Sequence, residues 1–153
     1  MYYFLEEDFK DLCLKIDELK KKLEEIGQEM GDSCRQSSET YHDNFPFEEG
    51  CRQQGMVSDR LTNLISIRNR VKIVVPDIME NSVSIGKIIV IKDMETNKEE
   101  TYRIGSYMIF NRMHGDVSYS APLIKIIIGA KAGDIREGKI GGEKKILKVL
   151  KVI

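Results

Sequence analysis

The stretch FKDLCLKIDELKKKLEEIGQEM, residues 9–30, decides the first half of the fold. Its apolar residues recur at alternating steps of three and four, which is the a/d pattern of a coiled-coil helix. Lysine and glutamate fill most positions between them, and both favour helix and solvate its outer face. The seam residues are Phe9, Leu12, Ile16, Leu19, Leu23, Ile26 and Met30. The stretch therefore predicts a long helix whose apolar stripe needs a partner.

The segment from Phe47 to Val71 offers that partner, because the same three-and-four rhythm returns there. The seam of this second segment is weakly apolar at its start and more apolar toward its end. In an antiparallel pair, the apolar parts of the two seams lie side by side, and so do the polar parts. Asn44 can cap this second helix, and Pro46 is tolerated in its first turn. The pattern predicts an antiparallel coiled-coil hairpin over residues 1–75, with its tip at about residues 37–45.

Residues 76–153 indicate a second, β-rich domain, and Pro76 marks a plausible boundary before it. Proline at the start and glycine at the end of residues 122–129 favour a short helix, although three consecutive isoleucines favour a strand. The predicted strands are residues 87–92, 100–104 and 146–153, with a closing hairpin turn at residues 141–142. The fold class is therefore α+β: a helical hairpin followed by a small, mostly antiparallel β domain with one short helix.

Charge is unevenly distributed along the chain. Residues 1–49 hold 14 Asp and Glu against 6 Lys and Arg. Tight binding to free DNA is not expected, because phosphate contacts need clustered lysine and arginine. A partner protein with a basic surface or channel fits better. The chain has no apolar run of about 18 residues and no basic, apolar secretory start, so we expect no membrane partner and a cytoplasmic location.

Several short motifs, in order and at matching spacing, resemble those of the bacterial GreA/GreB transcription elongation factors. That family carries an acidic tip motif of the form Asp-x-x-Glu-Asn with Gln-Gln-Gly beyond it. The β domain is similar in its Tyr-Arg-Ile strand, its Ile-Ser-x-x-Ser-Pro loop, and a later Ile-Gly and acidic turn. The matching stretches here are residues 40–44, 53–55, 102–104, 117–122, 128–129 and 133–134. The similarity runs from about Leu12 to the end of the chain.

The resemblance implies an accessory factor rather than an enzyme. Gre factors bind RNA polymerase through an FKBP-like domain and insert the hairpin into the secondary channel. There, tip carboxylates help hold a Mg²⁺ ion shared with the polymerase active site, and the polymerase cleaves backtracked RNA. Mg²⁺ prefers oxygen ligands, and two-metal hydrolysis uses one ion to generate the nucleophile. The implied factor has no cofactor of its own and meets the nascent RNA 3′ end only indirectly.

The family motifs assign candidate residues here. Asp43 and Glu39 are the candidate catalytic carboxylates, and Asp43, Glu39 and Thr40 are the candidate ligands of the shared Mg²⁺. The remaining candidates are tip residues Tyr41, His42 and Asn44, docking residues Ser118, Ser120 and Pro122, and RNA-proximal residues Arg35 and Arg52.

The tip departs from the family pattern at one of its two acids. Asp43 stands where the family has Glu, but Thr40 stands where the family has Asp. Glu39 is adjacent, yet one position rotates a side chain by about 100° around a helix. A threonine hydroxyl is a much poorer Mg²⁺ ligand than a carboxylate.

Three other functions stay open at this stage. A Gre-like protein can occupy the same channel and regulate or inhibit transcription without stimulating cleavage. The FKBP-like domain could act as an isomerase or chaperone, although its four aromatic rings are few for such a pocket. A coiled-coil adaptor without a polymerase partner would not need acids at the tip.

Overall fold

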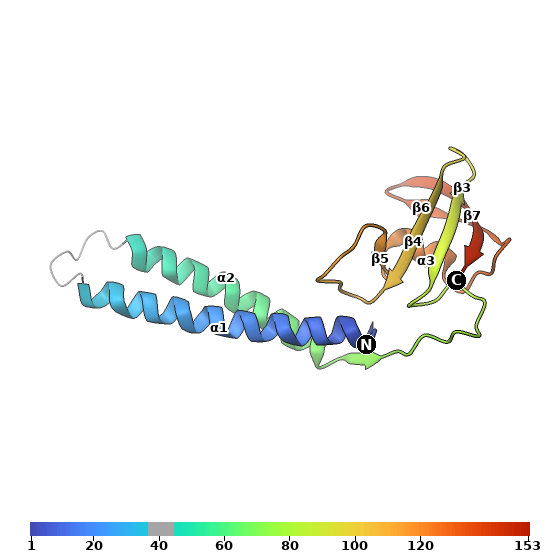
Figure 1. Cartoon of the computed structure of the whole chain (residues 1–153). Helices are drawn as coiled ribbons and strands as arrows, with labels where there is room; N and C mark the ends of the chain where they lie inside the picture. The colour runs from blue at the N-terminus through green and yellow to red at the C-terminus, as the bar shows by residue number, and fades with distance from the viewer. Residues whose placement is uncertain (37–44) are drawn as a thin grey trace. The chain divides into compact units, whose positions relative to one another are not determined.

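The computed structural model describes residues 1–36 and 45–153 (Figure 1). It contains two compact units, one formed by Met1–Asp11 with Val71–Ile153 and the other by Leu12–Arg70. This division differs from the boundary at residues 75/76 that the sequence indicates, because the first eleven residues group with the β-rich part. The element order is β1 (Tyr2–Phe4), α1 (Glu6–Gln36), α2 (Phe45–Arg68), β2 (Val71–Ile73), β3 (Ile88–Asp93), β4 (Glu99–Gly105), β5 (Asp116–Ser118), α3 (Pro122–Ile127), β6 (Ile135–Ile140) and β7 (Glu143–Val152).

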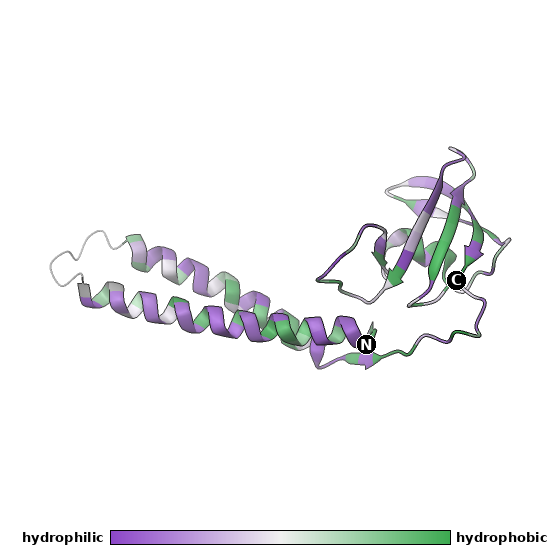
Figure 2. Cartoon of the chain, in the orientation of Figure 1, coloured by the Kyte–Doolittle hydropathy of each residue, from purple (hydrophilic) through white to green (hydrophobic). Residues whose placement is uncertain are grey.

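The helices α1 and α2 lie side by side as an antiparallel pair, as the apolar seams predict (Figure 1). Met30 near the end of α1 lies over Gly50 near the start of α2, so closely that an added Cβ would meet Met30 Cγ at 2.6 Å. The buried residues along the pair are Leu12, Ile16, Leu19 and Ile26 on α1 and Val57, Leu64 and Ile67 on α2. Apolar burial is therefore strongest toward the start of α1 and the end of α2, where green, hydrophobic residues gather in Figure 2.

The larger sheet has five strands in the order β5-β4-β3-β7-β6. The strands expected from the sequence are confirmed, although β7 begins at Glu143 rather than Ile146 and β6 was not foreseen as a separate strand. The predicted hairpin turn at Gly141 and Gly142 is confirmed, and both glycines have positive φ. The sheet is mixed, because β5 pairs with β4 in parallel.

Residues 122–127 are helical, so the helix is the correct one of the two alternatives that the sequence allowed. Pro122 opens α3, where its missing N–H costs no hydrogen bond. Gly129 follows at a φ of 76°, a conformation that favours glycine. Ile124 and Ile127 are fully buried against Ile89, Ile104 and other sheet residues. One face of the sheet is therefore covered by α3.

A second, two-stranded sheet pairs β1 with β2 in parallel, with Tyr2 opposite Val71 and Phe4 opposite Ile73. Neither strand was predicted, because three residues are too short to show a period in sequence. Phe4 is fully buried and Leu5 nearly so, which ties the start of the chain into the β unit. Within the part of the chain that the structure describes, no helix is long and apolar enough to cross a membrane.

Candidate functional site

The residues that connect α1 to α2 include every predicted tip residue. Glu39, Thr40 and Asp43, the candidate ligands of the shared Mg²⁺, lie outside the described residues. Tyr41, His42 and Asn44, together with the expected cap by Asn44, lie outside them as well. Over residues 1–36 and 45–153, no group of three or more His, Cys, Asp or Glu is placed to hold a metal ion. The roles assigned to the tip thus remain predictions.

Arg35 and Arg52, the two candidate RNA-proximal residues, both lie near the far end of the hairpin with exposed side chains. Arg35 occupies the last turn of α1, where the helix dipole favours a cation. Arg52 instead makes a fork-like contact with Glu49, with Nε 2.9 Å from Oε2 and Nη2 2.5 Å from Oε1. Hydrogen bonds from Arg52 and then Gln53 lower the pKa of Glu49 to about 2. Glu49 is thus kept ionised and largely offsets the charge of Arg52.

The predicted docking residues form a compact turn between β5 and α3. The hydroxyls of Ser118 and Ser120 lie 2.8 Å apart, and the Ser120 backbone N–H donates to Ser118 Oγ at 3.2 Å. Ser118 Oγ also donates to the Tyr107 carbonyl at 3.1 Å. Pro122 is exposed at the first turn of α3. The structure therefore brings all three predicted docking residues together, with the serines fixing the turn and the proline facing solvent.

Two tyrosines anchor this turn to the start of the chain. The Tyr119 hydroxyl accepts the backbone N–H of Tyr3 at 3.2 Å, and the two rings meet edge to face with centroids 5.9 Å apart. Tyr107 donates its backbone N–H to the Tyr3 carbonyl, and its ring lies 4.3 Å from that of Tyr2. An aromatic contact of this kind adds about 0.5–1.5 kcal/mol beyond burial. The docking turn thus depends on the first strand, which sequence reasoning did not connect to it.

A buried polar cluster joins the first turn of α1 to the end of β4. Ser106 is fully buried, and its hydroxyl accepts the Leu5 N–H at 2.8 Å while donating to the carboxylate of Asp8. The Ser106 N–H donates to the same Asp8 oxygen at 3.2 Å. On the surface nearby, Arg103 forms an ion pair with Glu7. Sequence analysis missed this cluster, because residues 8 and 106 carry no local signal of contact.

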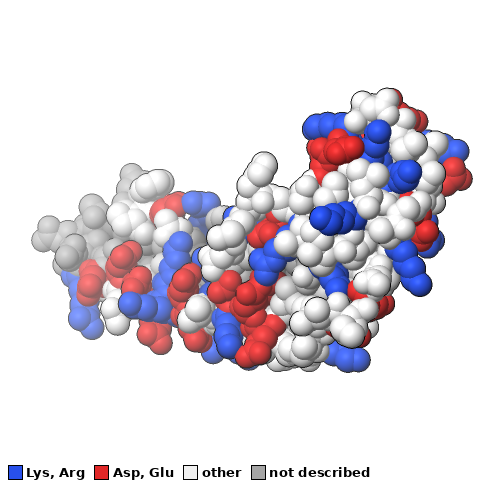
Figure 3. Space-filling model, turned by 45° about the vertical axis from the view of Figure 1, so that its right-hand side comes forward, with Lys and Arg blue, Asp and Glu red and all other residues white. Residues whose placement is uncertain are grey.

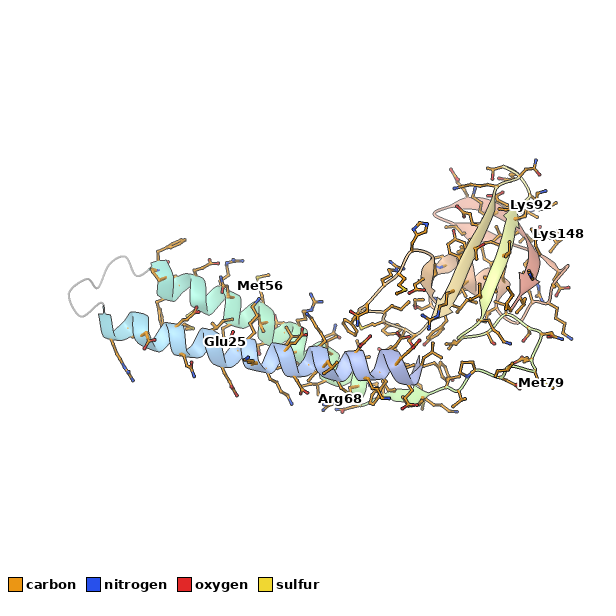
Figure 4. The ribbon with its side chains drawn as sticks, in the orientation of Figure 1. Glu25, Met56, Arg68, Met79, Lys92 and Lys148 are labelled. Atoms are coloured by element: carbon orange, nitrogen blue, oxygen red, sulfur yellow. The ribbon has the colours of Figure 1, made fainter. Side chains whose placement is uncertain are left out.

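An apolar groove opens beside the docking turn and has a cavity volume of about 390 Å³. Tyr3, Val75, Ile85, Tyr119 and Ile128 are among its lining residues. Between the lining residues Asp77 and Glu80, the side chains of Ile78 and Met79 are each 87% exposed, and Met79 is labelled in Figure 4. The turn therefore lies beside a groove whose lining is largely apolar.

The tyrosine of the Tyr-Arg-Ile strand has a structural role. The Tyr102 hydroxyl donates to Glu100 Oε2 at 2.6 Å, and Glu100 in turn pairs with Lys98 at 2.7 Å. Burial first, and then the hydrogen bond to Glu100, raise the pKa of Tyr102 to about 12. Tyr102 also packs against the core, so this residue supports the sheet beneath the docking turn.

The described residues thus form a pair of long helices and a β unit that presents a structured turn. The description "Transcription elongation factor, GreA/GreB, C-term" belongs to the family model that matches residues 78–153. The chain is 26% identical over 140 residues to the transcription elongation factor GreA of Thermosipho melanesiensis, covering 87% of this chain and 84% of that protein. It is 29% identical over 150 residues to GreA of Lachnoclostridium phytofermentans, covering 97% and 88%.

The chain belongs to the GreA/GreB family. Among solved structures, the GreA factor homolog 1 (Gfh1) of Thermus thermophilus matches 99% of this chain and 97% of its own, at 14% identity and a TM-score of 0.45. The confirmed fold class, a long helical pair followed by a β domain with one short helix, rests on the elements described above.

Proposed function

We propose that this chain is a Gre-type elongation factor that binds RNA polymerase, inserts its hairpin into the secondary channel, and promotes cleavage of backtracked RNA. The observation that carries the proposal is the antiparallel helical pair, whose two far ends are joined by the acid-bearing residues 37–44. The family match over the β unit and the GreA names of the relatives support the same function. In this proposal the polymerase performs the chemistry and the chain is an accessory factor.

The hairpin would act as a stiff carrier of carboxylate oxygens. Asp43 and Glu39 would supply carboxylate ligands to a Mg²⁺ ion shared with the polymerase. Thr40 would offer its hydroxyl as a further ligand. A divalent ion there would activate the attacking water and stabilise the leaving oxygen of the RNA. The hairpin needs no pocket of its own, which agrees with its narrow, charged surface, where acidic and basic side chains alternate in Figure 3.

The docking turn would hold the factor on the rim of the channel. Pro122 is exposed, and the apolar groove beside Tyr119 offers further contact area. Ser118 and Ser120 use their hydroxyls within the turn, so their part in docking is to fix its shape. The proposal therefore assigns contact to Pro122 and support to the two serines.

A backtracked elongation complex tests the proposal directly. With Mg²⁺ at neutral pH, the protein should shorten the RNA from its 3′ end, and Asp43→Ala should remove this activity while leaving polymerase binding intact. Glu25→Ala, which changes an exposed carboxylate on α1 (Figure 4), is the matched control and should cleave like the wild type. Equal cleavage by wild type and Asp43→Ala would sink the assignment of Asp43.

A second candidate function follows from Thr40, which stands where the family has an acid. The chain would then occupy the channel and regulate or inhibit transcription without stimulating cleavage. Glu39→Ala separates the two functions, because it should weaken cleavage only if Glu39 replaces the missing acid. Binding to polymerase with slowed elongation and no cleavage would favour this second function.

A further inference from the structure

The five-stranded sheet has a second face, opposite to the one that α3 covers. Side chains alternate across a sheet, so the neighbours of buried Ile89 and Ile91 on β3 point to this second face. Three lysines meet there: Lys92 on β3, and Lys148 and Lys151 on β7. Figure 4 labels Lys92 and Lys148. They lie near the end of β3, whereas Ile88 lies at its start.

Two features of the strand register gather these charges. Lys92 lies directly opposite Lys148, although like charges opposite each other destabilise a sheet. The register then shifts between Val90 and Ile91, which places Lys151 opposite Val90. Residues three apart on a regular strand point to opposite faces, so this β-bulge is what brings Lys151 to the same face as Lys148. The same shift places Val152 against the core, which is its structural benefit.

Two lysines of β7 have carboxylate partners, whereas Lys139 on β6 makes no ion pair among the described residues. Lys145 pairs with Asp93 at 3.3 Å and Lys144 with Glu137 at 3.1 Å. Among the residues that the structure describes, Lys92, Lys148 and Lys151 make no such ion pair, even though Glu99 lies opposite Lys92 on β4. Lys92 and Lys148 are half-buried and Lys151 is exposed, so their aliphatic stems can pack on the sheet, but this packing needs no positive charge.

The surroundings of the lysines indicate the kind of partner. The same face carries Ile88 on β3 and Ile135 on β6, which are 40% and 56% exposed, and the half-buried Val90 and Ile146. It carries no aromatic ring on which bases could stack. A duplex offers phosphates but little apolar surface for aliphatic side chains, whereas an acidic protein segment with aliphatic residues matches both the charge and the apolar area.

We infer that this face, formed around Lys92, Lys148 and Lys151, is a docking surface for an acidic, aliphatic-rich protein segment. The inference rests on the proposed function, in that the segment belongs to RNA polymerase. It adds a contact on the sheet, separate from the turn at residues 118–122. The charges accelerate association and fix orientation, while the aliphatic residues exclude water from the contact.

Binding of the full-length protein to immobilised core RNA polymerase tests the inference. The variant K92Q/K148Q/K151Q should raise the Kd about tenfold at roughly 0.1 M salt, or about twofold for each charge lost. K92R/K148R/K151R keeps the charges and should bind like the wild type. The control K20Q/K21Q/K22Q removes three exposed lysines from α1, which gives the same change in net charge. It should stay within twofold of the wild type.

Three outcomes overturn the inference. Unchanged affinity of K92Q/K148Q/K151Q does so while leaving the proposed function standing, because the wild type still binds. A 20-bp DNA duplex that loses binding to this variant, while polymerase affinity is kept, assigns the face to nucleic acid instead. A wild-type protein that does not bind polymerase refutes the proposed function, and the inferred partner with it. Thermal melts of each variant check that the fold is intact.

Discussion

The contact between Glu49 and Arg52 changes the interpretation of Arg52, which the sequence suggests as a residue near RNA. Arg52 was a candidate for contact with RNA because it flanks the tip. In the structure, its guanidinium donates two hydrogen bonds to the carboxylate of Glu49, three residues earlier. Its Nη1 also donates to Met56 Sδ at 3.3 Å. Such a bidentate pair fixes the fork in one orientation. Arg35, on the other helix, is the better candidate for contact with an anion.

Titration of Glu49 tests this contact. Because the pKa of Glu49 is lowered to about 2, its ion pair contributes to stability above the pKa of the unfolded chain and loses that contribution as the pH falls toward 2. Carboxyl chemical shifts measured by NMR should therefore show Glu49 still ionised at pH 3. In Arg52→Gln the pKa of Glu49 should rise toward the ordinary value of a glutamate, because the hydrogen bonds from Arg52 are lost. An ordinary pKa for Glu49 in the wild type contradicts the contact.

At the scale of elements, β7 combines a structural and a functional requirement. Its buried residues Leu147 and Val149 fill the core, and the bulge opposite Val90 returns Val152 to it. On the other side of the strand, Lys148 opposes Lys92 at a cost to the sheet. A strand selected for stability alone would carry an acid at position 148.

The substitution Lys148→Glu tests whether the Lys92–Lys148 pair lowers the stability of the sheet. It replaces a like-charge pair with an opposite-charge pair, so we expect the free energy of unfolding to rise by about 0.2–1 kcal/mol. Urea denaturation followed by circular dichroism measures the change. The same variant should bind polymerase more weakly, because it reverses a charge on the docking face. Lys125→Glu on α3, which alters an exposed lysine outside the sheet, is the control for net charge. A Lys148→Glu protein that is less stable than the wild type contradicts this view of the pair.

At the scale of the whole molecule, the start of the chain belongs to the unit formed by its second half. Phe4 and Leu5 are buried there, and Asp8 reaches Ser106 across nearly the full length of the sequence. The first turn of α1 is therefore fixed to the β unit by both apolar burial and a satisfied polar cluster.

Ser106→Ala tests the cluster. The substitution leaves the Leu5 N–H and a buried Asp8 oxygen each short of one hydrogen bond, which should lower the free energy of unfolding by about 1–3 kcal/mol. Urea denaturation of the full chain measures the loss. Ser66→Ala on α2, where the side chain is exposed, should change stability by no more than about 0.5 kcal/mol. Equal stability of Ser106→Ala and the wild type would show that the cluster is not buried in solution.

The sequence by itself determined the parts of this protein whose pattern is local. The heptad seam of α1, the proline that opens α3 and the glycines of the β6–β7 turn each act within a few residues, so their spacing is enough to predict the element. The family motifs likewise selected Ser118, Ser120 and Pro122, which the structure brings together in one turn, while their role in docking stays a prediction.

The tertiary structure alone decided which distant residues meet. The pairing of β1 with β2, the Asp8–Ser106 cluster and the three lysines on one sheet face all depend on contacts between segments far apart in the chain. A register shift of one residue moves a side chain to the other face of a sheet, and no local pattern encodes where that shift occurs. That is why Lys151 could be placed beside Lys148 only once the strands were paired.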